Sequence, residues 1–206
     1  MDLTMATEES PSEIIIDPRG DVRLRVGRNQ DDQSEVTFLA CSRALARASP
    51  VLDRMLYGNF LESKENSKAN DRADGWTVHL PEDKPQPIRI LLHLAHAQFH
   101  EIRDSLSIDK VYELTKLTHY YDATRLVVPW MGRLMPSIED VLTSPVAASD
   151  TSIPKMLWVS WELGLKDAFV DLSRKLLMES KGHWSAEETA EQVQTPPGVL
   201  GASMGD

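Results

Sequence analysis

The chain of 206 residues has one cysteine, Cys41. A single thiol cannot form an intrachain disulfide, and a zinc module built on paired cysteines is excluded for the same reason. Sequences that make no use of disulfides are typical of reducing compartments. We therefore expect the protein in the cytoplasm, the nucleus or both.

Long hydrophobic runs and clusters of basic residues are also missing. No apolar stretch is long enough to cross a bilayer, and the N-terminal "MDLTMATEES" is acidic and polar, unlike a secretory signal. Lys and Arg number 22 against 32 Asp and Glu, which gives a net charge of −10. Phosphate backbones are bound by clustered cations. The sequence therefore predicts neither a membrane nor a nucleic acid as a partner.

Hydrophobic residues make up 41% of the chain and charged residues 26%, as in an ordinary globular protein. Composition and turn signals predict five parts. These are a disordered N-terminus, 1–12; a folded domain, 13–136; a linker rich in Ser, Pro, Ala and Thr, 137–152; a helix pair, 153–182; and a disordered tail, 183–206.

Alternating apolar residues predict a small sheet in the first part of the domain. "EIIIDPRGDVRLRVG", residues 13–27, reads as a short strand, a Pro-Arg-Gly turn and a second strand. "EVTFLA", 35–40, and "WTVHL", 76–80, have the same alternation. We expect a β-hairpin at the start of the domain.

Helical spacing begins at "CSRALARASPVLDRMLYGNF", residues 41–60. Ser42 is the predicted N-cap of a first helix, Ser49-Pro50 starts a second one, and Gly58 ends it. An apolar central helix follows over 87–97, and Ser107 is expected to cap the next. Pro129 should open or kink the helix after that.

The two C-terminal helices are predicted over 153–163 and 166–180, with Gly164 between them. The first is apolar nearly all round and includes Trp158 and Trp161. Two helices alone cannot cover both faces of such an element. We therefore expect the pair to pack on the preceding domain.

Four segments in this order resemble a BTB/POZ domain, and they are most similar to the fungal members of that family. They are "IDPRGDVRLRVG", "FLACSRALARASPVLDRMLYGNF", "VHLPEDKPQPIRILLHLAHAQFHEI" and "YELTKLTHYYDATRLVVPWM". The resemblance covers about residues 13–136. It implies an α+β fold in which a small sheet caps a cluster of helices, extended here by the C-terminal pair. It also implies a protein–protein interaction role without catalysis or a cofactor, often as a homodimer.

The chain departs from the family at one position of functional interest. Relatives often have a histidine and a basic residue where Cys41 and Ser42 stand here. In transcription-regulating members that basic residue lines a pocket with an acid matching Asp21. The resemblance therefore does not imply co-repressor binding by this chain.

Two interaction sites are predicted. Ile14, Ile15 and Ile16 are consecutive, so their side chains cannot all point to one face of a strand, and an exposed one would mark a dimer edge. Phe99 and Glu101 resemble the hydrophobic-x-Glu motif with which some BTB proteins contact a cullin scaffold. A substrate adaptor of a cullin-type ubiquitin ligase is thus the alternative to a dimerising scaffold.

A function of another class rests on three histidines. His93, His96 and His100 are spaced by three and four residues, which would place them on one face of a continuous helix. Three imidazoles can hold zinc with an open fourth position, as in metal-dependent hydrolases. However, "QFHEI", 98–102, is where the helix is expected to end, and an end near Ala97 would remove His100 from the set.

Overall fold

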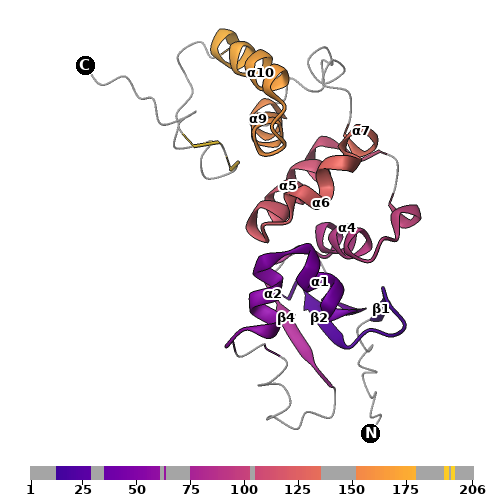
Figure 1. Ribbon diagram of the computed structural model, residues 1–206. Coiled ribbons are helices and arrows are strands. Elements are labelled where there is room, and N and C mark those ends of the chain that lie inside the picture. The colour runs from indigo at the N-terminus through magenta and orange to yellow at the C-terminus, as the bar shows by residue number, and fades with distance from the viewer. Residues whose placement is uncertain are drawn as a thin grey trace, which may run out of the picture. The chain divides into compact units, whose positions relative to one another are not determined.

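The computed structural model describes residues 13–28, 35–60, 63, 75–102, 105–135, 152–179, 193–194 and 196–197. They form two compact units, divided between Ala97 and Gln98 (Figure 1). A small sheet and a set of helices make the chain α+β, as predicted. The predicted disordered N-terminus and nearly all of the predicted linker lie outside the described residues.

The sheet of the first unit has four strands in the order β1-β3-β2-β4. They are β1 (Glu13–Ile15), β2 (Val22–Val26), β3 (Val36–Ala40) and β4 (Thr77–Leu80). β2 and β3 are antiparallel and form a hairpin, while β4 runs parallel to β2. The hairpin expected across the Pro-Arg-Gly turn is wrong, since the two strands that flank this turn are not paired. β1 does not pair with β2, its neighbour in sequence, but lies parallel to β3.

The turn after β1 crosses the end of β3, which explains this strand order. The amides of Ile16 and Asp17 both donate to the Leu39 carbonyl, at 2.9 and 3.1 Å. Gly20 then passes so close to Ala40 that a Cβ on it would lie 2.8 Å from the Ala40 carbonyl oxygen. Glycine is therefore required at this crossing.

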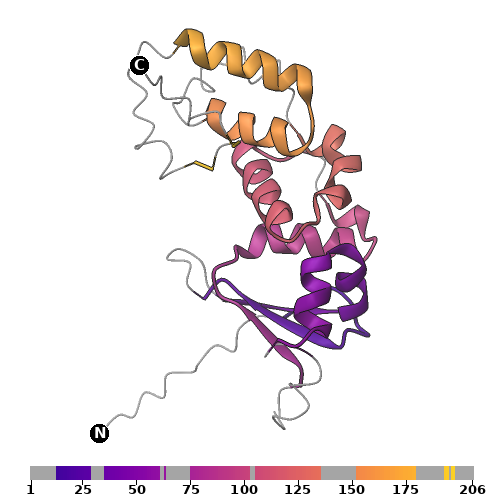
Figure 2. The same cartoon turned by 60° about the vertical axis from the view of Figure 1, so that its left-hand side comes forward.

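The described residues of the first unit also form the helices α1 (Ser42–Ala48), α2 (Pro50–Tyr57) and α4 (Pro85–Ala95). The Ser49 hydroxyl caps α2 by accepting from the Leu52 amide at 3.0 Å, and Gly58 ends that helix, as predicted. The predicted N-cap of α1 is wrong, since Cys41 holds that position and Ser42 is the first helical residue. α1 and α2 lie side by side next to the sheet (Figure 2).

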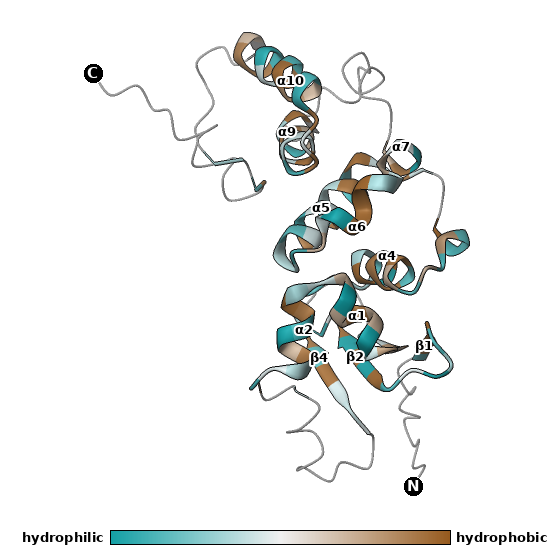
Figure 3. Cartoon of the chain, viewed as in Figure 1, coloured by the Kyte–Doolittle hydropathy of each residue, from teal (hydrophilic) through white to brown (hydrophobic). Residues whose placement is uncertain are grey.

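α4 ends two residues before the predicted boundary. His96 is its C-cap, and Ala97 has a φ of 57°, in the left-handed region that terminates helices. The helix is apolar over much of its circumference (Figure 3), and Ile88, Leu91 and Leu92 are buried. It is thus the central helix that the sequence predicted.

The second unit begins with the short 3₁₀ helix η1 (Phe99–Glu101), followed by α5 (Ile108–Tyr120). Ser107 is the N-cap of α5, but its side chain makes no capping hydrogen bond. Pro129 breaks the next helical stretch, as predicted, into α6 (Thr124–Val127), the 3₁₀ helix η2 (Val128–Trp130) and α7 (Met131–Leu134).

The C-terminal pair consists of α9 (Ser152–Glu162) and α10 (Lys166–Glu179), and Gly164 between them has a φ of 69°. α9 contacts both α5 and α10. Its buried side chains share a core with α10 and with the ends of α5 and α7; the members are Ile153, Met156, Leu157, Leu172 and Leu176, with Ile108, Met135 and Phe169 packed against them. Both faces of this apolar helix are thereby covered.

Within the described residues, no helix has the length and apolar character needed to cross a membrane.

Candidate interaction surfaces

β1 is an edge strand, paired on one side only within the described part of the sheet. The three consecutive isoleucines lie in three different environments. Ile16 is 1% exposed, Ile14 is half-buried, and Ile15 is 58% exposed. The alternation of side chains along a strand explains the difference. Among the described residues, an open backbone edge and an exposed branched aliphatic side chain therefore coincide at Ile15.

A carboxylate takes the place of the expected side-chain cap at the start of α1. Asp21 accepts from the backbone amide of Ser42 at 2.8 Å and from its hydroxyl at 2.9 Å. The same hydroxyl lies 2.5 Å from the Tyr57 hydroxyl, and Ser42 is fully buried. A negative group at a helix N-terminus satisfies an otherwise unpaired amide and favours the helix dipole. Asp21 thus fixes α1 against the sheet.

The three histidines do not form one ligand set. His96 accepts from the Cys41 amide through Nε2, at 2.9 Å, while its Nδ1 lies 2.8 Å from the Leu92 carbonyl oxygen and must carry the proton. Neither ring nitrogen is then available to a metal. His93 is buried, with Nε2 3.4 Å from Arg89 Nε, and His100 lies on η1, beyond the end of α4. Across the described residues, no three His, Cys, Asp or Glu side chains are placed to hold a metal ion.

Phe99 and Glu101 both lie on η1. The Phe99 ring is stacked on Trp130, with centroids 4.4 Å apart, and is 37% exposed. Glu101 is exposed and lies 3.4 Å from His100. The aromatic ring is therefore held in place by η2 while the carboxylate faces solvent.

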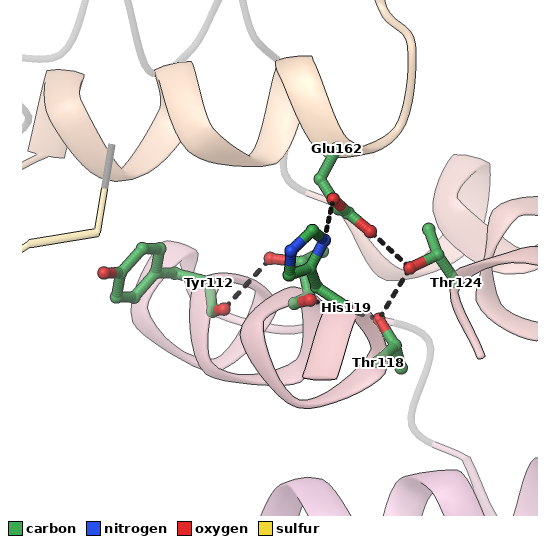
Figure 4. A network of polar contacts seen from close by, with 6 residues as sticks. Tyr112, Thr118, His119, Thr124 and Glu162 are labelled. Atoms are coloured by element: carbon green, nitrogen blue, oxygen red, sulfur yellow. Dashed lines mark hydrogen bonds and ion pairs between the residues drawn. The ribbon is translucent and has the colours of Figure 1, made fainter. Parts of the chain in front are cut away.

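A polar network that the sequence did not indicate connects α5, α6 and α9 (Figure 4). His119 Nδ1 lies 2.7 Å from one Glu162 oxygen, and the Thr124 hydroxyl donates to the other. The Thr124 hydroxyl is also 3.5 Å from that of Thr118. Both carboxylate oxygens are occupied by groups of the protein, so the network's role is to hold three helices together.

Two tryptophans of α9 surround the same imidazole. The His119 ring lies 5.1 Å from that of Trp158, edge to face, and 5.9 Å from that of Trp161. Glu162 comes 43 residues after His119 in the chain. No local pattern relates residues so far apart, which is why sequence reasoning missed the network.

No protein-family model and no curated protein matches the chain.

Proposed function

We propose that the chain is a protein–protein interaction module of the BTB/POZ type, a dimerising scaffold or adaptor that catalyses no reaction and acts in the cytoplasm or nucleus. The four sequence segments that resemble this family and the α+β class support the proposal. The observation that carries it is the exposed Ile15 on the edge strand β1.

An open strand edge with an exposed aliphatic side chain favours pairing with another chain. The simplest partner is a second copy, because a two-fold axis brings the same patch of each subunit together. Each dimer then removes two Ile15 side chains from water. Complete burial of an exposed isoleucine contributes about 1.5–3 kcal/mol, and Ile15 has 58% of its surface left to bury, so each copy contributes roughly half of that amount.

Replacing Ile15 with aspartate is therefore expected to convert the dimer to a monomer. The substitution places two negative charges opposite each other at the proposed interface, where like charges repel. Val170→Asp is the matched control, since Val170 on α10 is 51% exposed and lies in the other unit. Size-exclusion chromatography with light scattering should give a monomer for Ile15→Asp and a dimer for Val170→Asp. Equal masses for the two variants would contradict the role of β1.

A cullin adaptor is the second candidate function, and the placement of Phe99 and Glu101 favours it. The aromatic ring, stacked on Trp130, presents part of its surface beside an exposed carboxylate on the same turn. Such a pair can fill an apolar pocket and bond a cation on a partner.

Binding of a purified cullin scaffold protein tests this candidate. Glu101→Lys reverses the charge at an exposed position and should abolish binding, whereas His100→Ala, on the same turn, should preserve it. If wild-type chain does not bind, or if both variants bind as well as wild type, the cullin hypothesis is wrong and the scaffold role remains.

A further inference from the structure

The residues that the structure describes after α10 are Val193, Gln194, Pro196 and Pro197, and they belong to the second unit. They lie in the segment 183–206 that composition predicted to be unfolded. The Gln194 amide donates to the Tyr112 hydroxyl of α5 at 2.6 Å. Val193 is 2% exposed, and Pro196 is buried as well. These residues of the tail are thus bound to α5 of the second unit.

The surface that contacts the tail residues, here called the receiving face, consists of the Tyr112 hydroxyl as hydrogen-bond acceptor and two lysines beside the Tyr112 ring. Tyr112 is itself buried, and Lys116 Nζ and Lys155 Nζ lie 5.1 and 5.9 Å from the centroid of its ring. Lys155 also donates to Asp109 at 2.6 Å, which ties the start of α9 to the start of α5. The attraction between these two ammonium groups and the face of the Tyr112 ring favours the observed orientation of the ring. The hydroxyl is thereby positioned for a backbone amide.

Burial raises the pKa of the Tyr112 phenol above its ordinary value, and a nearby Glu113 adds to the shift. The hydrogen bond from Gln194 acts in the opposite direction. The phenol therefore stays neutral at physiological pH, and its oxygen accepts the Gln194 amide.

The contact recognises features that other chains can supply. One hydrogen bond goes to a backbone amide, which every residue except proline has. The side chains that become buried are a valine directly before that amide and a proline two residues after it. Backbone bonds give affinity and buried side chains give specificity, as in other modes of peptide recognition.

We propose that the face around Tyr112 is a binding site for a short peptide segment of a partner protein, of the pattern aliphatic-x-x-Pro, and that Val193, Gln194 and Pro196 of the same chain occupy it in the absence of the partner. This site goes beyond the dimer edge, because it lies in the other unit and requires neither Ile15 nor dimerisation. The tail acts as a built-in competitor: a covalently attached ligand has a high effective concentration, so a partner binds weakly until the tail is displaced.

Releasing the tail should therefore open the site to added peptide. The probe is a fluorescent peptide with the sequence of residues 189–199, "TAEQVQTPPGV", titrated into full-length protein and followed by anisotropy. Val193→Asp places a charge at a buried position of the tail and leaves the receiving face intact. We expect this variant to bind the peptide about tenfold or more tightly than wild type. Val170→Asp, the matched control on α10, should bind like wild type.

A double variant tests whether Tyr112 is the acceptor. Tyr112→Phe in the Val193→Asp background removes one hydrogen bond and should weaken peptide binding about 2–10-fold. If the peptide binds none of the variants, or binds wild type and Val193→Asp equally, the proposal is wrong. Peptide binding does not depend on the oligomeric state of the chain, so a failure of this proposal leaves the scaffold proposal unaffected.

Amide hydrogen exchange provides a second, independent readout in the folded wild-type chain. The Gln194 amide should exchange more slowly than in the free peptide, and Tyr112→Phe should accelerate it. Exchange as fast as in the free peptide would overturn the proposal. Protection that grows with protein concentration would also overturn occupation by the same chain, because it would place the tail on a second copy.

Discussion

Replacing Trp158 on α9, in the second unit, with alanine is expected to lower the free energy of unfolding by about 3–5 kcal/mol. Trp158 is 2% exposed and is among the largest fully buried side chains of the described residues. Its ring lies edge to face with His119 and 5.2 Å from Trp161. The substitution leaves a large cavity in the contact between α9 and α5, and urea denaturation followed by circular dichroism would measure the loss.

Trp158→Phe is the matched control. Within the described residues the indole nitrogen of Trp158 has no hydrogen-bond partner although it is buried. Phenylalanine removes this unsatisfied donor and keeps an aromatic ring, so it should cost much less than alanine. If alanine and phenylalanine destabilise equally, the ring contacts do not stabilise the unit as described. If alanine costs less than about 1 kcal/mol, the residue is not part of a packed core.

Replacing Asp21 with alanine is expected to cost about 3 kcal/mol, because two donors of a buried serine lose a charged acceptor. The Ser42 amide at the start of α1 has no partner within its own helix, and its hydroxyl would retain only Tyr57. Asp21→Asn keeps one acceptor oxygen and should cost less. The measurement is again the free energy of unfolding from urea denaturation.

Asp17→Ala is the control for this substitution. Asp17 accepts from the Arg19 amide at 2.8 Å, but that bond is exposed and closes only a local turn. Water can replace such a bond, so the cost should be below about 1 kcal/mol. Equal losses for Asp17→Ala and Asp21→Ala would mean that Asp21 does not anchor α1.

The features that sequence reasoning predicted depend on neighbouring residues. The alternation in "VRLRV" determines which side of β2 is buried, a helix starts at Ser49-Pro50, and Gly164 ends a helix by adopting a positive φ. The same alternation predicted that the three isoleucines could not share one environment. It did not tell which of them is exposed, since that depends on the pairing of β1 with β3.

The features that it missed connect residues far apart in the chain. Asp21 bonds Ser42 across 21 positions, His96 bonds Cys41 across 55, and Gln194 bonds Tyr112 across 82. The order of the strands belongs to the same class, because it follows from a turn that crosses the end of β3. The prediction of an unfolded tail rests on composition alone. Composition does not indicate that a single valine and a single proline of the tail are buried.

The proposed sites differ in how they could be found. Phe99, Glu101 and the isoleucines came from short motifs, and their roles in binding remain predictions. The Tyr112 face has no motif, because its parts come from α5, α9 and the C-terminal residues. Only the folded chain brings them together.

The mass of the full-length protein in solution tests the scaffold proposal most directly. Sedimentation equilibrium at micromolar concentration should give twice the chain mass of 23.1 kDa, and dilution should shift the distribution toward the monomer. A mass of 23.1 kDa that stays constant up to high micromolar concentration would contradict dimerisation through β1.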